Sequence, residues 1–223
     1  MEQLRIIYSK SKESTYVEKE DLEKIFEEAF KRAKIEIAYF SKKPDLTFVD
    51  PLPIGIESTG EILETSLVEH IQVSYFIKQM NNVLPSGITV LSAEYLKGDN
   101  TSVEGRVYGS TYLIDFVYDE KKIVGKTQKQ IDNMIAYYKE KMAEFLEQRE
   151  IQVLKKTNNR MERDDIKPYI IFYEFLIDSS LEISVATNKN IQIRPSDIMN
   201  GYSEYINEPM NYKSKRTKIL YNN

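Results

Sequence analysis

Residues 4–40, LRIIYSKSKESTYVEKEDLEKIFEEAFKRAKIEIAYF, decide the fold class because they indicate a strand, a helix and a second strand in succession. The apolar run Leu4–Tyr8 predicts the first strand. Apolar residues then recur every three or four positions across 22–33, which predicts a helix that buries one face. Alternation of apolar and polar residues from Ile35 to Tyr39 predicts the second strand.

The same kind of pattern continues outward to residue 95. A short strand is predicted at 46–49 and a longer one at 61–67, after a proline-rich break. A helix follows that ends near Pro85, and the half closes with a strand at 88–95. The predicted order is β-α-β-(β)-β-α-β.

A polar stretch at 98–102, Gly-Asp-Asn-Thr-Ser, separates this block from a second one of similar order. In the second block the longest helix is predicted at 127–148, and Thr127 with Gln130 forms a capping box that fixes its start. Strands are predicted at 106–118, 151–157, 169–177, 181–187 and 217–221, and a helix begins at Pro195.

Two successive β-α-β-β-α-β blocks are typical of a duplicated ferredoxin-like fold. We therefore expect an α+β protein built from two ferredoxin-like halves, each with an antiparallel sheet. The expected boundaries are residues 1–98 for the N-terminal half and 103–223 for the C-terminal half.

Composition excludes several classes of function. The chain of 223 residues contains no cysteine, which excludes disulfides, thiolate nucleophiles and cysteine-held zinc or iron–sulfur sites. No apolar run approaches the ~20 residues of a membrane span. We expect a cytoplasmic protein with no membrane contact, no metal site and no cofactor of its own.

Two apparent motifs are better explained as ordinary structure. Gly125-Lys126-Thr127 resembles the end of a phosphate-binding loop, but Glu120 stands where that loop needs a glycine, so a turn and a helix cap are favoured. His70 is the single histidine of the chain, which favours a surface or structural role over a catalytic or metal-binding one.

The connection at 51–61, Pro-Leu-Pro-Ile-Gly-Ile-Glu-Ser-Thr-Gly-Glu, has a composition that fixes loop geometry. It is either a rigid crossover whose glycines supply positive φ, or a ligand-binding loop in which Glu57 or Glu61 accepts a hydrogen bond. For the second alternative the candidate ligand-binding residues are Tyr39, Glu57, Ser58 and Glu61.

Basic residues are concentrated towards the C-terminus. The chain has a net charge of −4, yet residues 151–223 carry 11 basic and 9 acidic side chains. Two clusters, at 155–163 and 213–218, are flanked by tyrosines, a combination that binds phosphates and stacks bases. The alternative is a solvated charged face. The candidate RNA-binding residues are Lys155, Lys156, Arg160, Lys167, Lys213, Lys215, Arg216 and Lys218.

Several short motifs together resemble the radical-SAM-linked family, a bacterial domain of unknown function fused to or encoded beside radical SAM proteins. The motifs are Ile7-Tyr8-Ser9-Lys10, Ala38-Tyr39, the run at 51–61, Asp165-Ile166-Lys167-Pro168-Tyr169, Arg194-Pro195 and Arg216-Thr217-Lys218-Ile219-Leu220-Tyr221. The resemblance extends over nearly the whole chain, and the run at 51–61 is its most specific part.

The sequence departs from that family at two histidine motifs. Glu18-Lys19-Glu20-Asp21 replaces Ser-His-Leu-Asp, and Ser41-Lys42-Lys43-Pro44-Asp45 replaces a longer Asn-Pro-His-Pro loop. The resemblance implies a radical SAM protein as partner, because a chain without cysteine must leave the iron–sulfur chemistry to another protein.

Three hypotheses follow. The first is a non-catalytic accessory protein that acts with a radical SAM enzyme and contacts structured RNA. The second is an RNA-modifying enzyme that uses Glu57, Glu61 or Asp165 as a general base or nucleophile. The third is a protein-binding scaffold, which predicts an exposed apolar patch instead of a basic one.

Overall fold

The computed structural model describes residues 1–96, 102–157, 160–177, 179–187 and 192–222. The chain is a mixture of helices and mostly antiparallel strands, as expected for an α+β protein. It forms two compact units, residues 1–108 with 215–223, and residues 109–214. Most of the expected boundary at 98–102 lies outside the described residues, and residues 215–223, expected in the C-terminal half, belong to the first unit.

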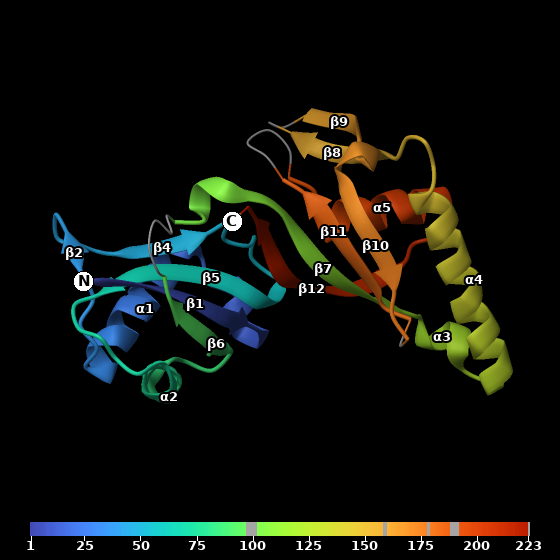
Figure 1. Ribbon diagram of the computed structural model, residues 1–223. Helices are drawn as coiled ribbons and strands as arrows, with labels where there is room; N and C mark the ends of the chain where they lie inside the picture. The colour runs from blue at the N-terminus through green and yellow to red at the C-terminus, as the bar shows by residue number, and fades with distance from the viewer. Residues whose placement is uncertain (97–101, 158–159, 178, 188–191, 223) are drawn as a thin grey trace. The chain divides into compact units, whose positions relative to one another are not determined.

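The first unit contains a sheet covered by two helices (Figure 1). Strand β5 lies beside β1, and β1 lies beside β6, all antiparallel. On its other edge β5 pairs antiparallel with β4. The elements are β1 (Glu2–Lys10), η1 (Lys12–Tyr16), α1 (Lys19–Ala33), β2 (Tyr39–Phe40), β3 (Lys43–Pro44), β4 (Leu46–Val49), β5 (Glu57–Leu67), α2 (Val73–Val83), β6 (Ile88–Tyr95) and η2 (Glu104–Arg106).

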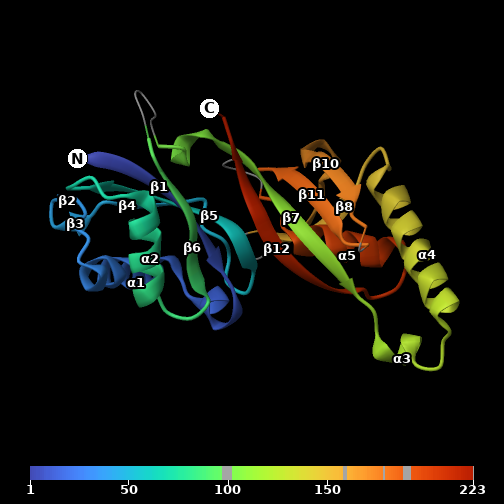
Figure 2. The ribbon, with the colours of Figure 1, turned by 60° about the horizontal axis from the view of Figure 1, so that its bottom comes forward.

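Helices α1 and α2 cover the same face of this sheet (Figures 1 and 2). The spacing of apolar residues in α1 places Phe26 and Phe30 on its inner side, where both are buried. They pack with Phe76 of α2 and with Leu4 and Leu63 of the sheet in one hydrophobic core. Burial of these faces is the main stabilising contribution in the unit.

The predicted strand at 35–39 is not continuous in the structure. Ile37 makes an isolated bridge to Leu67, and the chain then leaves the edge of β5 as the short hairpin of β2 and β3. It returns to the same edge as β4. The turn residues Ser41 and Lys42 both have positive φ, 51° and 69°, which is typical of a two-residue type I′ turn.

The second unit has its own antiparallel strands and two long helices. Strand β11 pairs with β10 and with β7, and β8 pairs with β9 in a separate hairpin. Most of β7 (Val107–Val117) and the beginning of β12 (Asn211–Tyr221) belong to this unit, whereas residues 215–221 of β12 belong to the first. Its other elements are α3 (Glu120–Ile123), α4 (Gln128–Leu146), β8 (Gln152–Thr157), β9 (Arg160–Asp165), η3 (Lys167–Tyr169), β10 (Ile170–Phe175), β11 (Leu181–Ala186) and α5 (Pro195–Tyr205).

The predicted start of α4 is confirmed, because the Thr127 hydroxyl accepts from the backbone N–H of Gln130 and the Gln130 side chain accepts from that of Thr127. The buried face of α4 packs on α5, where the Tyr202 hydroxyl donates to the carbonyl oxygen of Tyr138 at 2.8 Å. Among the described residues, no helix has the length and apolar character to cross a membrane.

Candidate functional site

Strand β12 packs closely against β5 at Gly60. Residues Lys215 and Arg216 pair in parallel with Glu57 and Ser58. A Cβ atom on Gly60 would lie only 2.3 Å from the carbonyl oxygen of Thr217, so a side chain at this position would hold the two strands apart. The close approach brings two candidate ligand-binding residues, Ser58 and Glu61, against a candidate RNA-binding residue, Arg216.

Arg216 is the centre of a buried ionic cluster. Its side chain is 1% exposed, and its Nε and Nη2 lie 3.0 and 2.7 Å from the two carboxylate oxygens of Glu61. Its Nη1 lies 2.8 Å from Oδ2 of Asp50, and the Ser58 hydroxyl donates to the Arg216 carbonyl oxygen at 3.1 Å. The guanidinium is therefore neutralised inside the unit and is withdrawn from any RNA-binding surface.

Two residues of β1 complete the cluster. Lys10 is buried, and its Nζ donates to the Val17 carbonyl oxygen at 2.7 Å. Burial lowers the pKa of Lys10, the nearby Glu61 opposes this shift, and the Arg216 charge adds to it. Burial, and then the Glu61 charge, raise the pKa of Tyr8 well above its ordinary value.

One feature of the sequence could have predicted the burial of Lys10. Leu4, Ile6, Tyr8 and Lys10 share a face of β1, and all four are buried. A lysine at the end of an inward-facing alternation indicates a buried cation that needs carboxylate neighbours. The contact of Asp50 with Arg216 could not be predicted from a sequence pattern, because the position of Asp50 depends on its positive φ of 43° directly after β4.

The candidate catalytic carboxylates are occupied by intramolecular partners. Glu61 accepts from Arg216, and Asp165 accepts from the backbone N–H groups of Ile151 and Lys167 at 2.8 and 3.0 Å. Glu57 is exposed and accepts from the backbone N–H of Lys12 at 3.4 Å. This arrangement suits structural roles better than proton transfer.

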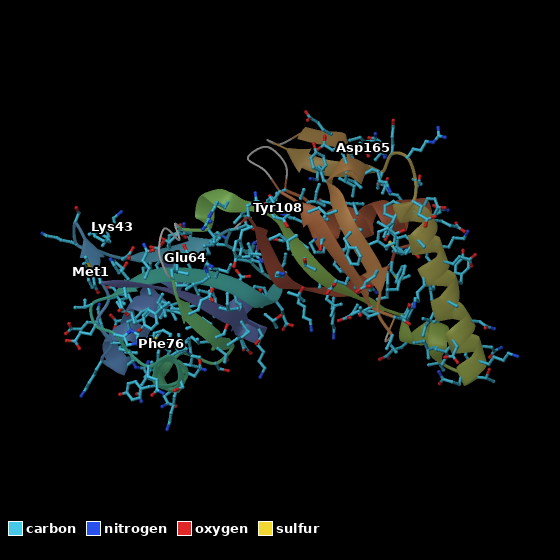
Figure 3. The ribbon with its side chains drawn as sticks, in the orientation of Figure 1. Met1, Lys43, Glu64, Phe76, Tyr108 and Asp165 are labelled. Carbon is cyan, nitrogen blue, oxygen red and sulfur yellow. The ribbon has the colours of Figure 1, made fainter. Side chains whose placement is uncertain are left out.

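Tyr39 lies elsewhere, beside a pocket of about 490 Å³. Phe30, Ile35 and Ile37 are buried residues in its wall. The pocket lies next to the β2–β3 hairpin, which Lys43 marks in Figure 3. Its lining residues are Glu27, Phe30, Lys31, Lys34, Ile35, Glu36, Ile37, Tyr39 and Val68.

Tyr39 is anchored to α1 although its side chain remains 46% exposed. Its hydroxyl lies 3.0 Å from Oε1 of Glu27, which also pairs with Lys31 at 2.9 Å. The hydrogen bond from Lys31 lowers the pKa of Glu27, so the carboxylate stays an acceptor at neutral pH. Burial, followed by this bond to Glu27, raises the pKa of Tyr39. The tyrosine therefore forms a fixed wall of the pocket.

The basic candidates differ in their exposure and in their partners. Besides Arg216, two lysines bind intramolecular partners: Lys155 Nζ donates to the Gln192 carbonyl oxygen at 2.9 Å, and Lys167 Nζ donates to that of Leu146. The backbones of Lys156 and Arg160 belong to the β8–β9 hairpin, but their side chains lie outside the description. Lys213 and Lys218 are exposed and Lys215 is half-buried.

The single histidine of the chain, His70, lies at the surface. The His70 Nδ1 lies 2.5 Å from Oε2 of Glu2, and its ring stacks on Tyr95 with centroids 4.5 Å apart, which is a surface contact. Within the described ranges, no three histidine or carboxylate side chains come together as a metal site would require.

The fold and these sites define a mixed α/β protein with an open apolar pocket and a closed ionic cluster. Residues 3–195 match the family described as "Uncharacterized protein conserved in bacteria (DUF2344)", and the chain belongs to that family. A comparison with curated proteins found no match. Among solved structures, the crystal structure of an unknown protein from Galdieria sulphuraria is similar, with 8% identity, coverage of 96% of this chain and 98% of that chain, and a TM-score of 0.27.

Proposed function

We propose that this chain is a non-catalytic accessory protein of the cytoplasm that binds a partner protein through the pocket beside Tyr39, and that the partner is a radical SAM enzyme. The observation that carries the proposal is the pocket itself. It combines an apolar wall with charged residues at its margin, and its volume of about 490 Å³ is that of a binding site.

The chemistry of the pocket fits a protruding apolar side chain of a partner protein. Phe30, Ile35 and Ile37 provide an apolar surface that is already ordered by the core. Val68 extends it outward, with 46% of its surface exposed. An apolar centre within a polar rim is the usual anatomy of a protein interface.

The identity of the partner is inferred from the sequence. The motifs at 7–10 and 51–61 resemble the radical-SAM-linked family, and a chain with no cysteine needs another protein to hold an iron–sulfur cluster. The occupied carboxylates Glu61 and Asp165 favour this accessory role over the alternative of an RNA-modifying enzyme.

The test is co-purification of the tagged protein from its native cells in parallel with two variants. Val68→Asp places a charge in the pocket, whereas Leu91→Asp places one at a similarly exposed aliphatic residue of β6, 48% against 46% exposed. A radical SAM protein should be recovered with the wild type and Leu91→Asp, and lost with Val68→Asp, at equal thermal stability. Equal recovery with all three proteins, or recovery of no radical SAM protein, would refute the proposal.

RNA contact is a second candidate, supported by Lys213, Lys215 and Lys218 of β12. Within the described part of the chain, none of these three lysines pairs with a carboxylate. If they contact phosphates, affinity for a structured RNA should fall steeply with salt, and replacing all three with glutamine should flatten that slope. Treating the co-purification with RNase separates this contact from partner docking.

We also propose that the two halves are related to the ferredoxin-like fold. In the first unit, β6, β1, β5 and β4 lie in that order with antiparallel neighbours, and α1 and α2 share one face. This is the arrangement expected of one β-α-β-β-α-β half. A duplicated fold would suit a protein-binding scaffold, the third hypothesis, as well as it suits the accessory role.

A further inference from the structure

A second pocket lies wholly within the second unit and has no part in the function proposed above. It has a volume of about 180 Å³ and lies where the end of β7, the short helix α3 and the beginning of β12 meet α4. Its lining residues are Val117, Tyr118, Asp119, Lys122, Tyr138, Pro209, Met210 and Asn211.

The Tyr118 hydroxyl is the unusual group in this pocket. Its oxygen is buried and finds no hydrogen-bond partner among the residues that the structure describes. A buried polar group of this kind destabilises the folded protein unless a bound molecule satisfies it. Burial raises the pKa of Tyr118 to about 12, so the hydroxyl keeps its proton and remains a donor at neutral pH.

The walls of the pocket are aromatic. The rings of Tyr118 and Tyr138 are tilted by 35° with centroids 5.8 Å apart. Lys122 lies over the Tyr138 ring, with its Nζ 5.9 Å from the centroid. Such walls stack well on a flat ring.

The cation at the pocket is already paired, and the exposed Asp119 adds a negative charge to the lining. Lys122 pairs with Glu208, and the Tyr138 hydroxyl donates to the same carboxylate at 2.9 Å. The cation therefore has its counter-ion within the protein. Asn211 is exposed at the rim and carries both an amide donor and an amide acceptor. An uncharged ligand with donors and acceptors on its edge fits this site better than an anion.

The volume limits the ligand to a single ring. A cavity of roughly 150 Å³ holds one benzene molecule, and the pocket here is slightly larger at about 180 Å³. We propose that it binds a pyrimidine nucleobase, with a ring carbonyl accepting from the Tyr118 hydroxyl and the ring face against the tyrosines. The base enters either as a free nucleoside or as an unstacked base of an RNA strand.

Calorimetric titration of the intact protein tests this inference. The probes are uridine, cytidine and a short oligouridylate, each with wild type, Tyr118→Phe and Tyr137→Phe. Tyr137 is 50% exposed on α4 and does not line the pocket, so its variant is a matched control. Loss of one hydrogen bond should weaken binding by roughly 2- to 12-fold in Tyr118→Phe and leave Tyr137→Phe unchanged.

A second variant and a second readout remove ambiguity. Met210→Trp should block the pocket with a bulky side chain and abolish binding. Tyr118→Phe should melt at the same temperature as wild type or higher, because it removes an unsatisfied group.

Binding of the nucleosides alone identifies a small-molecule site, and equal losses for nucleoside and oligouridylate identify a base within RNA. Absence of binding by every pyrimidine probe, or binding unaffected by Tyr118→Phe, would overturn the inference. None of these readings depends on the partner protein.

Discussion

Nη2 of Arg216 lies 2.7 Å from Oε2 of Glu61, although the two residues are 155 positions apart in the sequence. This pair joins the last strand, β12, to β5 in the interior of the first unit. It is shielded from solvent, with side chains that are 1% and 3% exposed. The chain therefore needs its C-terminal segment to complete the N-terminal unit.

Replacing Arg216 with Met should destabilise the protein by about 3–5 kcal/mol, because Glu61 remains buried without its cation and the partly exposed Asp50 loses the same partner. Urea unfolding followed by circular dichroism measures the change. The double variant Arg216→Met/Glu61→Met should recover part of the loss. Lys218→Met, at an exposed position of the same strand, is the control and should change stability by less than ~0.5 kcal/mol.

Replacing Gly60 with Ala should cost about 1–3 kcal/mol, since the new Cβ would lie 2.3 Å from the Thr217 carbonyl oxygen. Thermal unfolding is the measurement. Gly105→Ala is the matched control, because a Cβ there meets no atom within 4 Å. Equal melting temperatures for the two variants would show that β12 does not pack against Gly60 as described.

Local patterns predicted much of this fold. The three- and four-residue spacing in α1 identified Phe26 and Phe30 as core residues, and both are buried. The capping box at Thr127 correctly fixed the start of α4. These features depend on neighbours within one or two turns, so a sequence pattern contains all the information that they need.

Contacts between distant segments could not be predicted in this way. Lys155 and Arg216 stand in charged runs, which are usually solvated. In the structure both side chains are largely buried, and each pairs with a carboxylate from another element. The composition of residues 51–61 predicted a loop of fixed geometry, but it could not predict that Glu57 and Ser58 pair with β12. The pocket beside Tyr39 depends on a hairpin that interrupts the predicted strand at 35–39.

The effect of pH on stability should reveal the buried Lys10. Burial lowers its pKa below the ordinary value of 10.5, so the folded protein binds this proton less tightly than the unfolded chain. At neutral pH the buried charge therefore lowers stability, and this cost disappears as the pH rises towards 10.5. Lys10→Met should gain stability relative to wild type most strongly at neutral pH, with the difference shrinking at higher pH. Urea unfolding between pH 7 and 10 measures it, and Lys78→Met, exposed on α2, should show no such trend.

The turn of the β2–β3 hairpin offers a way to strengthen partner binding without touching the pocket. Ser41 and Lys42 adopt positive φ, which costs energy for both side chains and suits Asn-Gly. Glycine at 42 relieves the ~1–2 kcal/mol cost of a left-handed residue but loses roughly 0.5–1 kcal/mol to chain entropy. Ser41→Asn/Lys42→Gly should therefore raise stability by about 0.5–1 kcal/mol, measured as a higher melting temperature.

The same change should tighten binding of the partner, because Tyr39 and Phe40 enter the hairpin directly beside the pocket and would be held more rigidly. Lys42→Pro is the opposing variant, since proline cannot adopt the φ of 69° found there. It should weaken docking while the core of α1 and α2, which the hairpin does not join, stays folded. If both variants bind the partner as wild type does, the hairpin contributes nothing to the interface, and the docking surface must be sought away from Tyr39.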